Sequence, residues 1–198
     1  MSAELIKEDR TKNGLDNALR ELLKRKSLEQ IRVRELTDLC AIRRQSFYYH
    51  FTDVYALFDW SLRQERTRLL LRQENCLTWQ QALRDLLAYT GERRSYYLAL
   101  LQSRGRTGLR EVTRDAITRP LEKTLAYYRQ RCGAPRDPAE EQAQVACWET
   151  ILLALLEGWL WDDLRQPPEE VVGLMESSVQ KEIIGAAWLC VPQWRAQD

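Results

Sequence analysis

Apolar residues recur along most of the chain at intervals of three and four, the spacing that places them on one face of a helix. The first clear stretch runs from Leu15 to Leu23 and ends in the three cations of 24–26. Cations suit the negative end of a helix dipole. The pattern therefore predicts a helix near the start of the chain.

Two short helices are predicted next, over 33–40 and 44–50, separated by the tight link 41–43. A fourth helix is expected to run from Asp53, a residue type favoured as an N-cap, to about Leu70. Short helices joined by a tight turn and followed by a longer helix are typical of a helix-turn-helix head.

Four apolar side chains are expected to anchor the two short helices. Leu36 and Leu39 should face inward from the first, and Phe47 and Phe51, four residues apart, from the second. The remaining side chains of the second short helix then lie on its other faces.

Longer helices are predicted for the rest of the chain. The expected elements are helices over 78–89 and 93–102, a loop over 105–108, a helical stretch to 131 that Pro120 kinks or splits, and helices over 138–164 and 169–184.

Helix breakers are sparse, with 8 glycines and 6 prolines in 198 residues. The predicted class is therefore all-α, with about nine helices. We expect an N-terminal three-helix helix-turn-helix domain over 1–52 and a C-terminal helical domain for dimerisation and ligand binding over 53–198.

Composition narrows the class of protein further. The chain is 44% hydrophobic and 30% charged with a net charge of +1, which favours a folded globular protein. Its most hydrophobic window, 145–161, carries Glu149 and Glu157 and is expected to be too short and too polar to span a membrane. The N-terminus has no apolar signal core, so a cytoplasmic protein is predicted.

The five cysteines stand at positions 40, 76, 132, 147 and 190, and no pair has the spacing of metal ligands. Buried reduced thiols are the expected state. No metal and no cofactor are predicted.

The stretch 39–52 contains no carboxylate. A surface that approaches phosphates must avoid carboxylates and offer cations and neutral hydrogen-bond donors. The candidate residues that meet this requirement are Arg43, Arg44, Gln45, Ser46, Tyr48, Tyr49 and His50. The alternative is an ordinary surface helix whose two tyrosines are half-buried against its neighbours.

The run Phe47-Tyr48-Tyr49-His50-Phe51, followed by Asp53, Tyr55, Leu57 and Phe58, resembles the DNA-binding domain of the TetR family of transcriptional regulators. Together with Arg44-Gln45-Ser46 and Trp60, it is most similar to the DhaS-like subgroup. The specific resemblance covers about residues 10–65, and the remainder agrees in the number and length of its helices.

The resemblance implies a role for each candidate. Arg34 would reach a base or a phosphate from the start of the second helix, and Tyr48 and His50 would hold phosphates. The residues implied to face the major groove are Arg44, Gln45, Ser46 and Tyr49. Four positions depart from the family pattern, namely Arg32, Ala41, Arg43 and Val54, where Ser or Thr, Gly, Ser and Lys are usual.

The charge distribution supports a nucleic-acid partner only weakly. Residues 1–68 carry a net charge of +3, and the remaining residues carry −2. DNA affinity is therefore expected to depend on a local patch and on a dimer.

The helix predicted over 138–164 is apolar around most of its circumference. A seam at 3-4-3-4 spacing is expected at Val145, Trp148, Leu152, Leu155 and Trp159, with a second stripe at Val172, Met175 and Val179 in the last helix. The alternative is that the first of these helices is the core helix of a monomer. The family resemblance favours a homodimer, in which two helices from each chain form a four-helix bundle.

Aromatic residues are frequent in the body, and members of the family enclose an effector between their middle helices. The residues predicted to line such a pocket are Tyr96, Tyr97, Arg119, Tyr127 and Trp148. The expected effector is a small apolar or aromatic molecule.

The predicted function is that of a ligand-responsive transcriptional regulator, a repressor that binds a palindromic double-stranded operator as a homodimer. The alternative is a DhaS-like coactivator or helical adaptor that a protein partner controls. An enzyme is not expected, because the single histidine, His50, lies in the DNA motif. The chain also lacks an HExxH motif and a Gly-rich phosphate loop.

Overall fold

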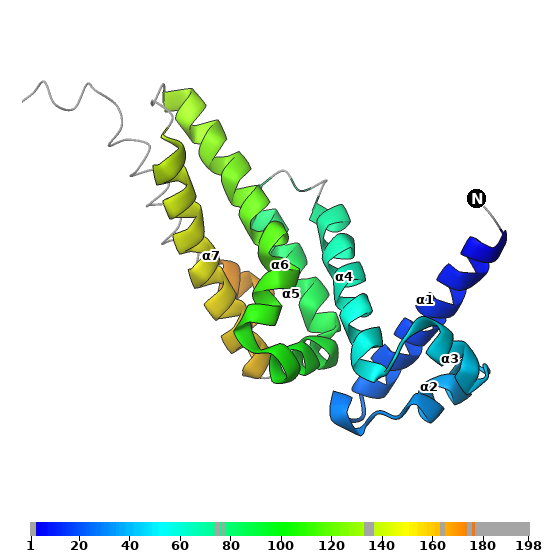
Figure 1. Ribbon diagram of the computed structural model, residues 1–198. Coiled ribbons are helices and arrows are strands. Elements are labelled where there is room, and N and C mark those ends of the chain that lie inside the picture. The colour runs from blue at the N-terminus through cyan, green and yellow to red at the C-terminus, as the bar shows by residue number, and fades with distance from the viewer. Residues whose placement is uncertain are drawn as a thin grey trace, which may run out of the picture. The chain divides into compact units, whose positions relative to one another are not determined.

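The computed structural model describes residues 3–73, 76, 78–132, 137–162, 165–173 and 176. Within these ranges the chain is helical and has no strand (Figure 1), which confirms the all-α class. The elements are α1 (Ala3–Leu23), the 3-10 helix η1 (Leu28–Gln30), α2 (Val33–Leu39), α3 (Arg44–His50), α4 (Val54–Gln73), α5 (Trp79–Glu92), α6 (Arg94–Cys132) and α7 (Pro138–Trp161). Residues 168–173 are also helical, and most of the last predicted helix lies outside the described residues.

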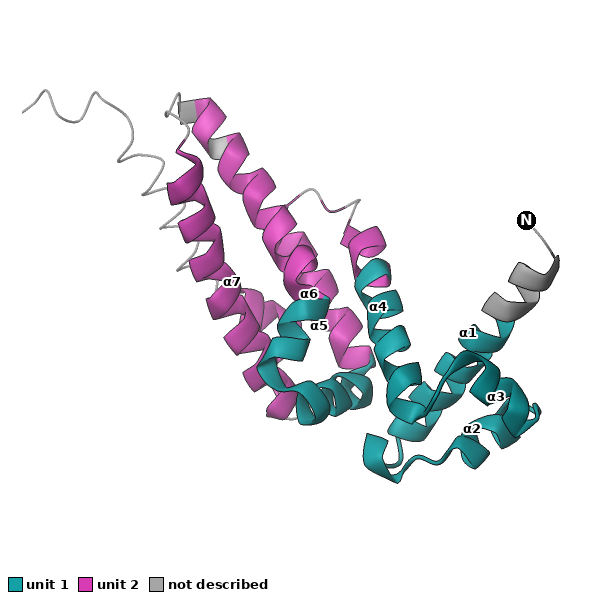
Figure 2. Ribbon diagram, viewed as in Figure 1, with its two compact units in different colours: residues 1–67, 93–112 teal, residues 68–92, 113–198 magenta. Residues whose placement is uncertain are grey.

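The chain forms two compact units (Figure 2). Unit 1 contains residues 1–67 and 93–112, and unit 2 contains residues 68–92 and 113–198. Both α4 and α6 therefore begin in unit 1 and end in unit 2. The domain boundary predicted between residues 52 and 53 falls inside unit 1, because parts of α4 and α6 pack with the N-terminal helices.

The core of unit 1 contains the predicted anchors of the helix-turn-helix. Leu36 and Phe47 are fully buried, and Phe51 is 6% exposed, with its ring 5.9 Å from that of Phe47. The inward position predicted for Leu39 is wrong, since this side chain is 59% exposed. α2 ends at Leu39, and the chain turns away before anything can cover it.

The turn between α2 and α3 has the hydrogen bonds of a Schellman motif. The N–H of Ala41 donates to the carbonyl of Asp38 (3.2 Å), and that of Ile42 donates to the carbonyl of Thr37 (3.0 Å). Ala41 takes the left-handed position of this motif, with φ of 50°. Glycine is usual there because a Cβ atom is strained in this conformation.

Replacing Ala41 with glycine is therefore expected to stabilise the protein. The gain in the free energy of unfolding should be about 1 kcal/mol, the strain of one left-handed alanine. Urea denaturation measures it. The matched control is Ala126→Gly on the exposed surface of α6, which should lose about 1 kcal/mol through helix propensity. If both variants lose stability, the strain assigned to Ala41 is absent.

α6 is broken at Gly105, which has φ of 61° and ψ of −162°. This region of backbone conformation is nearly exclusive to glycine. The loop predicted over 105–108 is thus a single residue, and the helix resumes directly after it. Of the kink or split predicted at Pro120, the split is absent, because the helix continues through this residue. The hydroxyl of Thr124 donates to the carbonyl of Pro120 (2.8 Å).

Unit 2 contains α5, the second part of α6 and α7. Two of these helices begin at capping side chains. The N–H of Gln81 donates to Oγ1 of Thr78 (3.2 Å), and the N–H of Ala139 donates to Oδ1 of Asp137 (2.9 Å). The core between them is built from large apolar side chains, which include Trp79, Leu86, Ile117, Leu121, Trp148, Leu152 and Leu156.

By length and composition, α7 could cross a membrane, and it is the one such helix among the described residues. α7 has 24 residues and is longer than the most hydrophobic window of the sequence, 145–161. The mean hydropathy of its most apolar stretch is 1.2. The core helix of a globular unit has the same composition. Since Trp148, Leu152 and Trp159 are buried in unit 2, the core position accounts for this apolar character.

Candidate nucleic-acid interface

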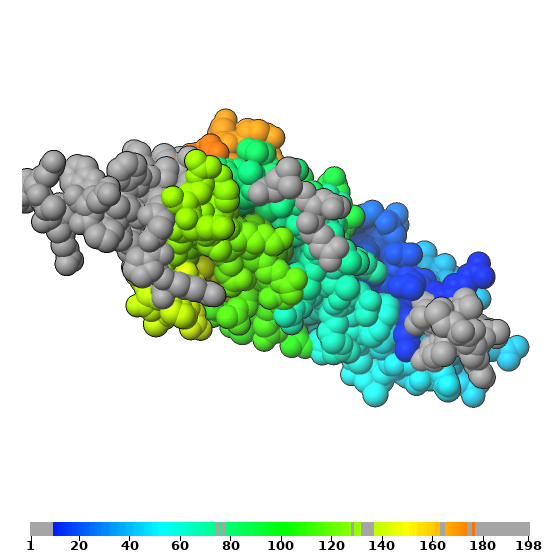
Figure 3. Space-filling model, turned by 90° about the horizontal axis from the view of Figure 1, so that it is seen from above, coloured from blue at the N-terminus to red at the C-terminus, as the bar shows by residue number. Residues whose placement is uncertain are grey.

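α2 and α3 lie side by side next to α1 (Figure 1), and their atoms reach the surface at one end of unit 1 (Figure 3). Phe47 fixes α3 to the core of unit 1, and its ring meets that of Tyr48 edge-on at 5.5 Å. The opposite side of α3 is left facing outward. This arrangement is that of a helix-turn-helix, in which the second helix enters the major groove.

The structure brings the predicted DNA-contacting residues together around this outward side. Ser46 and His50 are half-buried, and the exposed members are Arg43, Arg44, Gln45, Tyr48 and Tyr49. No carboxylate lies on α3 or in the turn before it. This surface can therefore offer cations, an amide and hydroxyl groups to phosphates and base edges.

The two tyrosines are the most informative members of this surface. Tyr48 is 57% exposed and Tyr49 is 79% exposed, so the alternative of two half-buried tyrosines is wrong. The ring of Tyr49 makes an edge-on contact with His50 at 4.9 Å, which holds it at the surface. Exposed apolar patches are a common feature of interaction sites.

Arg34 lies at the start of α2 and is exposed. Its Nε is 3.5 Å from Oδ2 of Asp38 on the same helix, and both side chains are about 70% exposed. An exposed pair of this kind contributes about 0–1 kcal/mol. Arg34 can therefore leave Asp38 for a phosphate at little cost.

The start of α2 also shows how the chain compensates for Arg32, which stands where a Ser or Thr cap is usual. The carboxylate of Glu35 accepts the backbone N–H of Arg32 (3.0 Å) and forms an ion pair with Lys26. The hydrogen bond from Lys26, and then that from Arg32, lower the pKa of Glu35. The carboxylate of Glu35 thus supplies the half of a capping box that comes from the third helical residue. Val54, where lysine is usual, is buried and belongs to the core.

The residues predicted for the dimer seam mostly face the interior of unit 2. Val145, Trp148, Leu152, Trp159 and Val172 are between 1% and 7% exposed in the single chain, so they offer little surface to a second one. The indole N–H of Trp159 donates to the carbonyl of Gln166 (2.8 Å) within the same unit. Leu155 is half-buried, and Met175 and Val179 lie outside the described residues.

A different stripe of α7 is exposed. We call it the outer stripe, and it consists of Cys147, Ile151, Ala154, Gly158 and Trp161. Its members keep a 4-3-4-3 spacing, offset by one position from most of the predicted seam. Ile151 and Trp161 are 42% and 50% exposed, which is unusual for such large apolar side chains on a helix that otherwise packs in a core.

Of the five residues predicted to bind an effector, two belong to unit 1 and three to unit 2. Tyr96 and Tyr97 are buried in unit 1, where their hydroxyls bond to Ser61 (2.8 Å) and Glu65 (2.9 Å). The other three belong to unit 2, where Arg119 and Tyr127 are exposed and Trp148 is buried.

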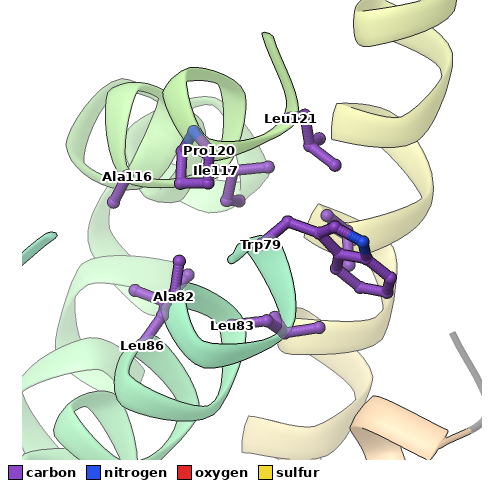
Figure 4. A pocket seen from close by; sticks show the side chains of 9 residues that line it. Trp79, Ala82, Leu83, Leu86, Ala116, Ile117, Pro120 and Leu121 are labelled. Carbon is purple, nitrogen blue, oxygen red and sulfur yellow. The ribbon is translucent and has the colours of Figure 1, made fainter. Parts of the chain in front are cut away.

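A small space lies between α5, α6 and α7, lined by apolar side chains such as Trp79, Pro120 and Leu152 (Figure 4). Its volume is about 10 Å³, which is room for about one water molecule. A larger groove of about 570 Å³ lies in unit 1 between η1, α4 and α6. None of the five predicted effector residues lines either space.

Known proteins are similar to this chain well beyond the helix-turn-helix. Residues 77–181, more than half of the chain, match the family described as the transcriptional regulator C-terminal region TetR_C_8. The chain is also 28% identical over 87 residues to the HTH-type dhaKLM operon transcriptional activator DhaS of Lactococcus lactis. That alignment covers 44% of this chain and 46% of DhaS, so it spans about half the length of the curated relative.

A solved structure has the same fold. The dihydroxyacetone kinase operon activator DhaS superposes with a TM-score of 0.65 over 91% of this chain and 98% of its own, at 16% sequence identity. The family match covers the helices after residue 76, whereas the motif that resembles the family's DNA-binding domain lies before residue 65. Two separate parts of the sequence therefore agree, and the chain belongs to the TetR family of transcriptional regulators, with a relation to its DhaS-like members.

Proposed function

We propose that this protein binds a palindromic DNA operator as a homodimer and thereby regulates transcription. The observation that supports this proposal best is the exposed side of α3, where Arg44, Gln45 and Tyr49 project from a helix that contains no carboxylate. A surface with this chemistry suits the edges of bases and the phosphates beside them.

A dimer is needed because α3 has only seven residues. One helix of this length reads a few base pairs, and two copies related by a twofold axis read a palindrome. We propose that the outer stripe of α7 forms the seam between the two chains. Ala154 and Gly158 would let two helices approach closely there, and Ile151 and Trp161 would lose their exposure to water.

The DNA flanking the gene of this protein is the first test. A footprint with the purified protein should show a protected region with twofold symmetry. The apparent affinity should fall steeply between about 50 and 200 mM salt, because each neutralised phosphate releases counterions. A duplex of the same composition in scrambled order is the control. Binding that is independent of salt, or equal protection of the scrambled duplex, would contradict the proposal.

The direction of regulation is predicted to be repression. The relative DhaS is named as an activator, so the prediction needs a test of its own. A promoter–reporter fusion, measured with and without the gene for this protein, shows directly whether the protein represses or activates transcription. Higher reporter output in the absence of the protein is the expected result, and lower output would assign activation.

For the control of the regulator, we favour a protein partner over a metabolite. The supporting observation is the small space among α5, α6 and α7, which is about 10 Å³ in volume. A drug-sized ligand needs a pocket of about 300 Å³ or more, so a metabolite would have to bind outside this space, for instance in the groove of about 570 Å³ in unit 1. We expect a panel of metabolites to leave operator binding unchanged and a second protein to alter it. Release of the operator by one metabolite at a saturable concentration would restore the small-molecule alternative.

A further inference from the structure

Unit 1 contains a group of polar side chains that are buried where α1, α4 and α6 meet. We call it the Arg20 network, and its members are Asp16, Arg20, Ser61, Glu65, Tyr96 and Tyr97. All of them except Arg20 are at most 3% exposed, and the side chain of Arg20 is 16% exposed. Each of the three helices contributes two members.

The guanidinium of Arg20 is the centre of the network. Its Nε lies 3.1 Å from both carboxylate oxygens of Asp16 on α1. Its Nη2 donates to Oε2 of Glu65 at 2.9 Å and to Oγ of Ser61 at 3.2 Å, both on α4. The same guanidinium lies 4.1 Å from the ring centre of Tyr96 on α6. One planar, rigid side chain thus contacts all three helices.

Hydroxyl groups complete the network. The hydroxyl of Tyr97 donates to Oε1 of Glu65 at 2.9 Å, and that of Ser61 donates to Asp16. Because Ser61 has only one proton, the hydroxyl of Tyr96 must donate to Ser61 across their 2.8 Å contact. Every member therefore has a partner on a neighbouring helix.

Burial has opposite consequences for the two groups at the centre. It would lower the pKa of Arg20, but the charges of Glu65 and Asp16 outweigh it and raise that pKa above its ordinary value. It raises the pKa of Tyr96, which stays neutral and keeps its proton for Ser61. The network therefore contains one cation and two carboxylates in a setting where leaving any of them unpaired is costly.

Buried polar networks of this kind differ from apolar packing in their consequences. Apolar contacts between helices tolerate small shifts, whereas a hydrogen-bonded network is satisfied in one arrangement only. Replacing a buried group of ions by apolar side chains is often neutral for stability, although it removes this directional constraint. A variant with an apolar core at this place can therefore keep its stability and lose its fixed helix orientation, which separates a positioning role from a purely stabilising one.

Resting on the proposed function, we propose that Arg20 is a positioning residue for DNA binding. It fixes α1 on α4 and α6 in one orientation, and α1 carries α2 and α3 with it. α1 packs on α2 next to Gly14, where an added Cβ would lie 3.9 Å from Sγ of Cys40. The orientation of α3 toward the operator thus depends on a network that touches no DNA.

The decisive variant is Asp16→Leu/Arg20→Met/Glu65→Leu/Tyr97→Phe, which replaces the charged members by apolar side chains and removes the Tyr97 hydroxyl that donates to Glu65. The hydroxyls of Ser61 and Tyr96 still have each other as partners. We expect the variant to fold cooperatively. If α1, α2 and α3 of this variant take the orientation that binds DNA only a tenth of the time, operator affinity falls about tenfold. The salt dependence of binding should stay the same, since no phosphate contact is removed. Fluorescence anisotropy measures both.

The matched control is Asp59→Asn. It removes the exposed ion pair between Asp59 on α4 and Arg104 on α6, two of the three helices that the network joins. Operator affinity should stay within about twofold of that of the parent, because exposed pairs contribute little. An equal loss in this control would show that any weakening of the contact between α4 and α6 suffices, and would overturn the special role of Arg20.

A fully folded quadruple variant with the affinity of the parent would also overturn the proposal. Should that variant not fold, Glu65→Gln decides, because its amide keeps the shape and an acceptor while the charge is removed. A roughly twofold to fivefold loss of affinity is expected for a partly loosened head, and unchanged affinity would count against the role.

Failure of the proposed function can be told apart from failure of this inference. If the parent protein does not bind DNA at all, the proposed function is wrong. Amide exchange in the folded variants then tests the positioning role by itself. The amides of α1 to α3 should exchange faster in the variant that lacks the network than in Asp59→Asn, and equal rates would reject it.

Discussion

The double variant Arg44→Ala/Tyr49→Ala is expected to lose most of its operator affinity and most of its sequence preference. Each side chain that reads a base edge contributes about 1–3 kcal/mol, so the pair should cost at least about 2 kcal/mol, or roughly 30-fold in affinity. Both side chains project from the exposed side of α3, and Tyr49 is 79% exposed. The fold should therefore be unaffected by their loss.

The measurement is fluorescence anisotropy on the operator and on a scrambled duplex, with circular dichroism to check folding. The matched control is Arg84→Ala/Tyr127→Ala, which removes an exposed arginine and an exposed tyrosine from unit 2. This control should bind as the parent does. His50→Ala should weaken the two duplexes alike, because a phosphate contact carries no sequence information. Parental affinity in the α3 double variant would rule out this helix as the reading element.

The helix-turn-helix could be predicted closely because its pattern is local. The two short helices lie within one residue of their predicted bounds, and Phe47 and Phe51 are buried as expected. Neighbouring residues determine such elements through spacing and turn chemistry. The exception is Leu39, whose exposure depends on where the chain turns after α2.

The face that α7 buries could not be read from the sequence. The helix is apolar nearly all round, and a 3-4 spacing can be followed along two stripes offset by one residue. One stripe contains Trp148 and Leu152, and the other contains Cys147 and Ile151. Which of them is buried depends on the contacts with α5 and α6, and these are tertiary contacts that periodicity does not contain.

The Arg20 network could not be predicted from the sequence for a related reason. The density of aromatic side chains and the family resemblance predict Tyr96 and Tyr97 as pocket residues. Their hydroxyls are occupied by Ser61 and Glu65, which lie more than 30 positions earlier in the chain. A signal was present in α1, where Asp16 and Arg20 lie four residues apart beside the apolar face. A charged pair at that place can be an exposed pair or a buried one, and only packing decides between them.

The second large effect is expected for Ile151→Glu on the outer stripe of α7. Ile151 is 42% exposed in the single chain, so a carboxylate there can stay hydrated in a monomer and cost the fold little. At a twofold seam the variant would bury a carboxylate from each chain, at a cost of several kcal/mol. A folded monomer is therefore the expected product.

Light scattering after size-exclusion chromatography should show the parent as a dimer and the Ile151→Glu variant as a monomer. Operator affinity should fall by about 100-fold or more, because two linked heads gain at least that factor over one. The neighbouring change Leu152→Glu is the contrasting case. This side chain is 4% exposed within unit 2, so the same carboxylate should unfold the protein instead of only dissociating it. An Ile151→Glu variant that stays dimeric and binds the operator normally would place the seam on another surface.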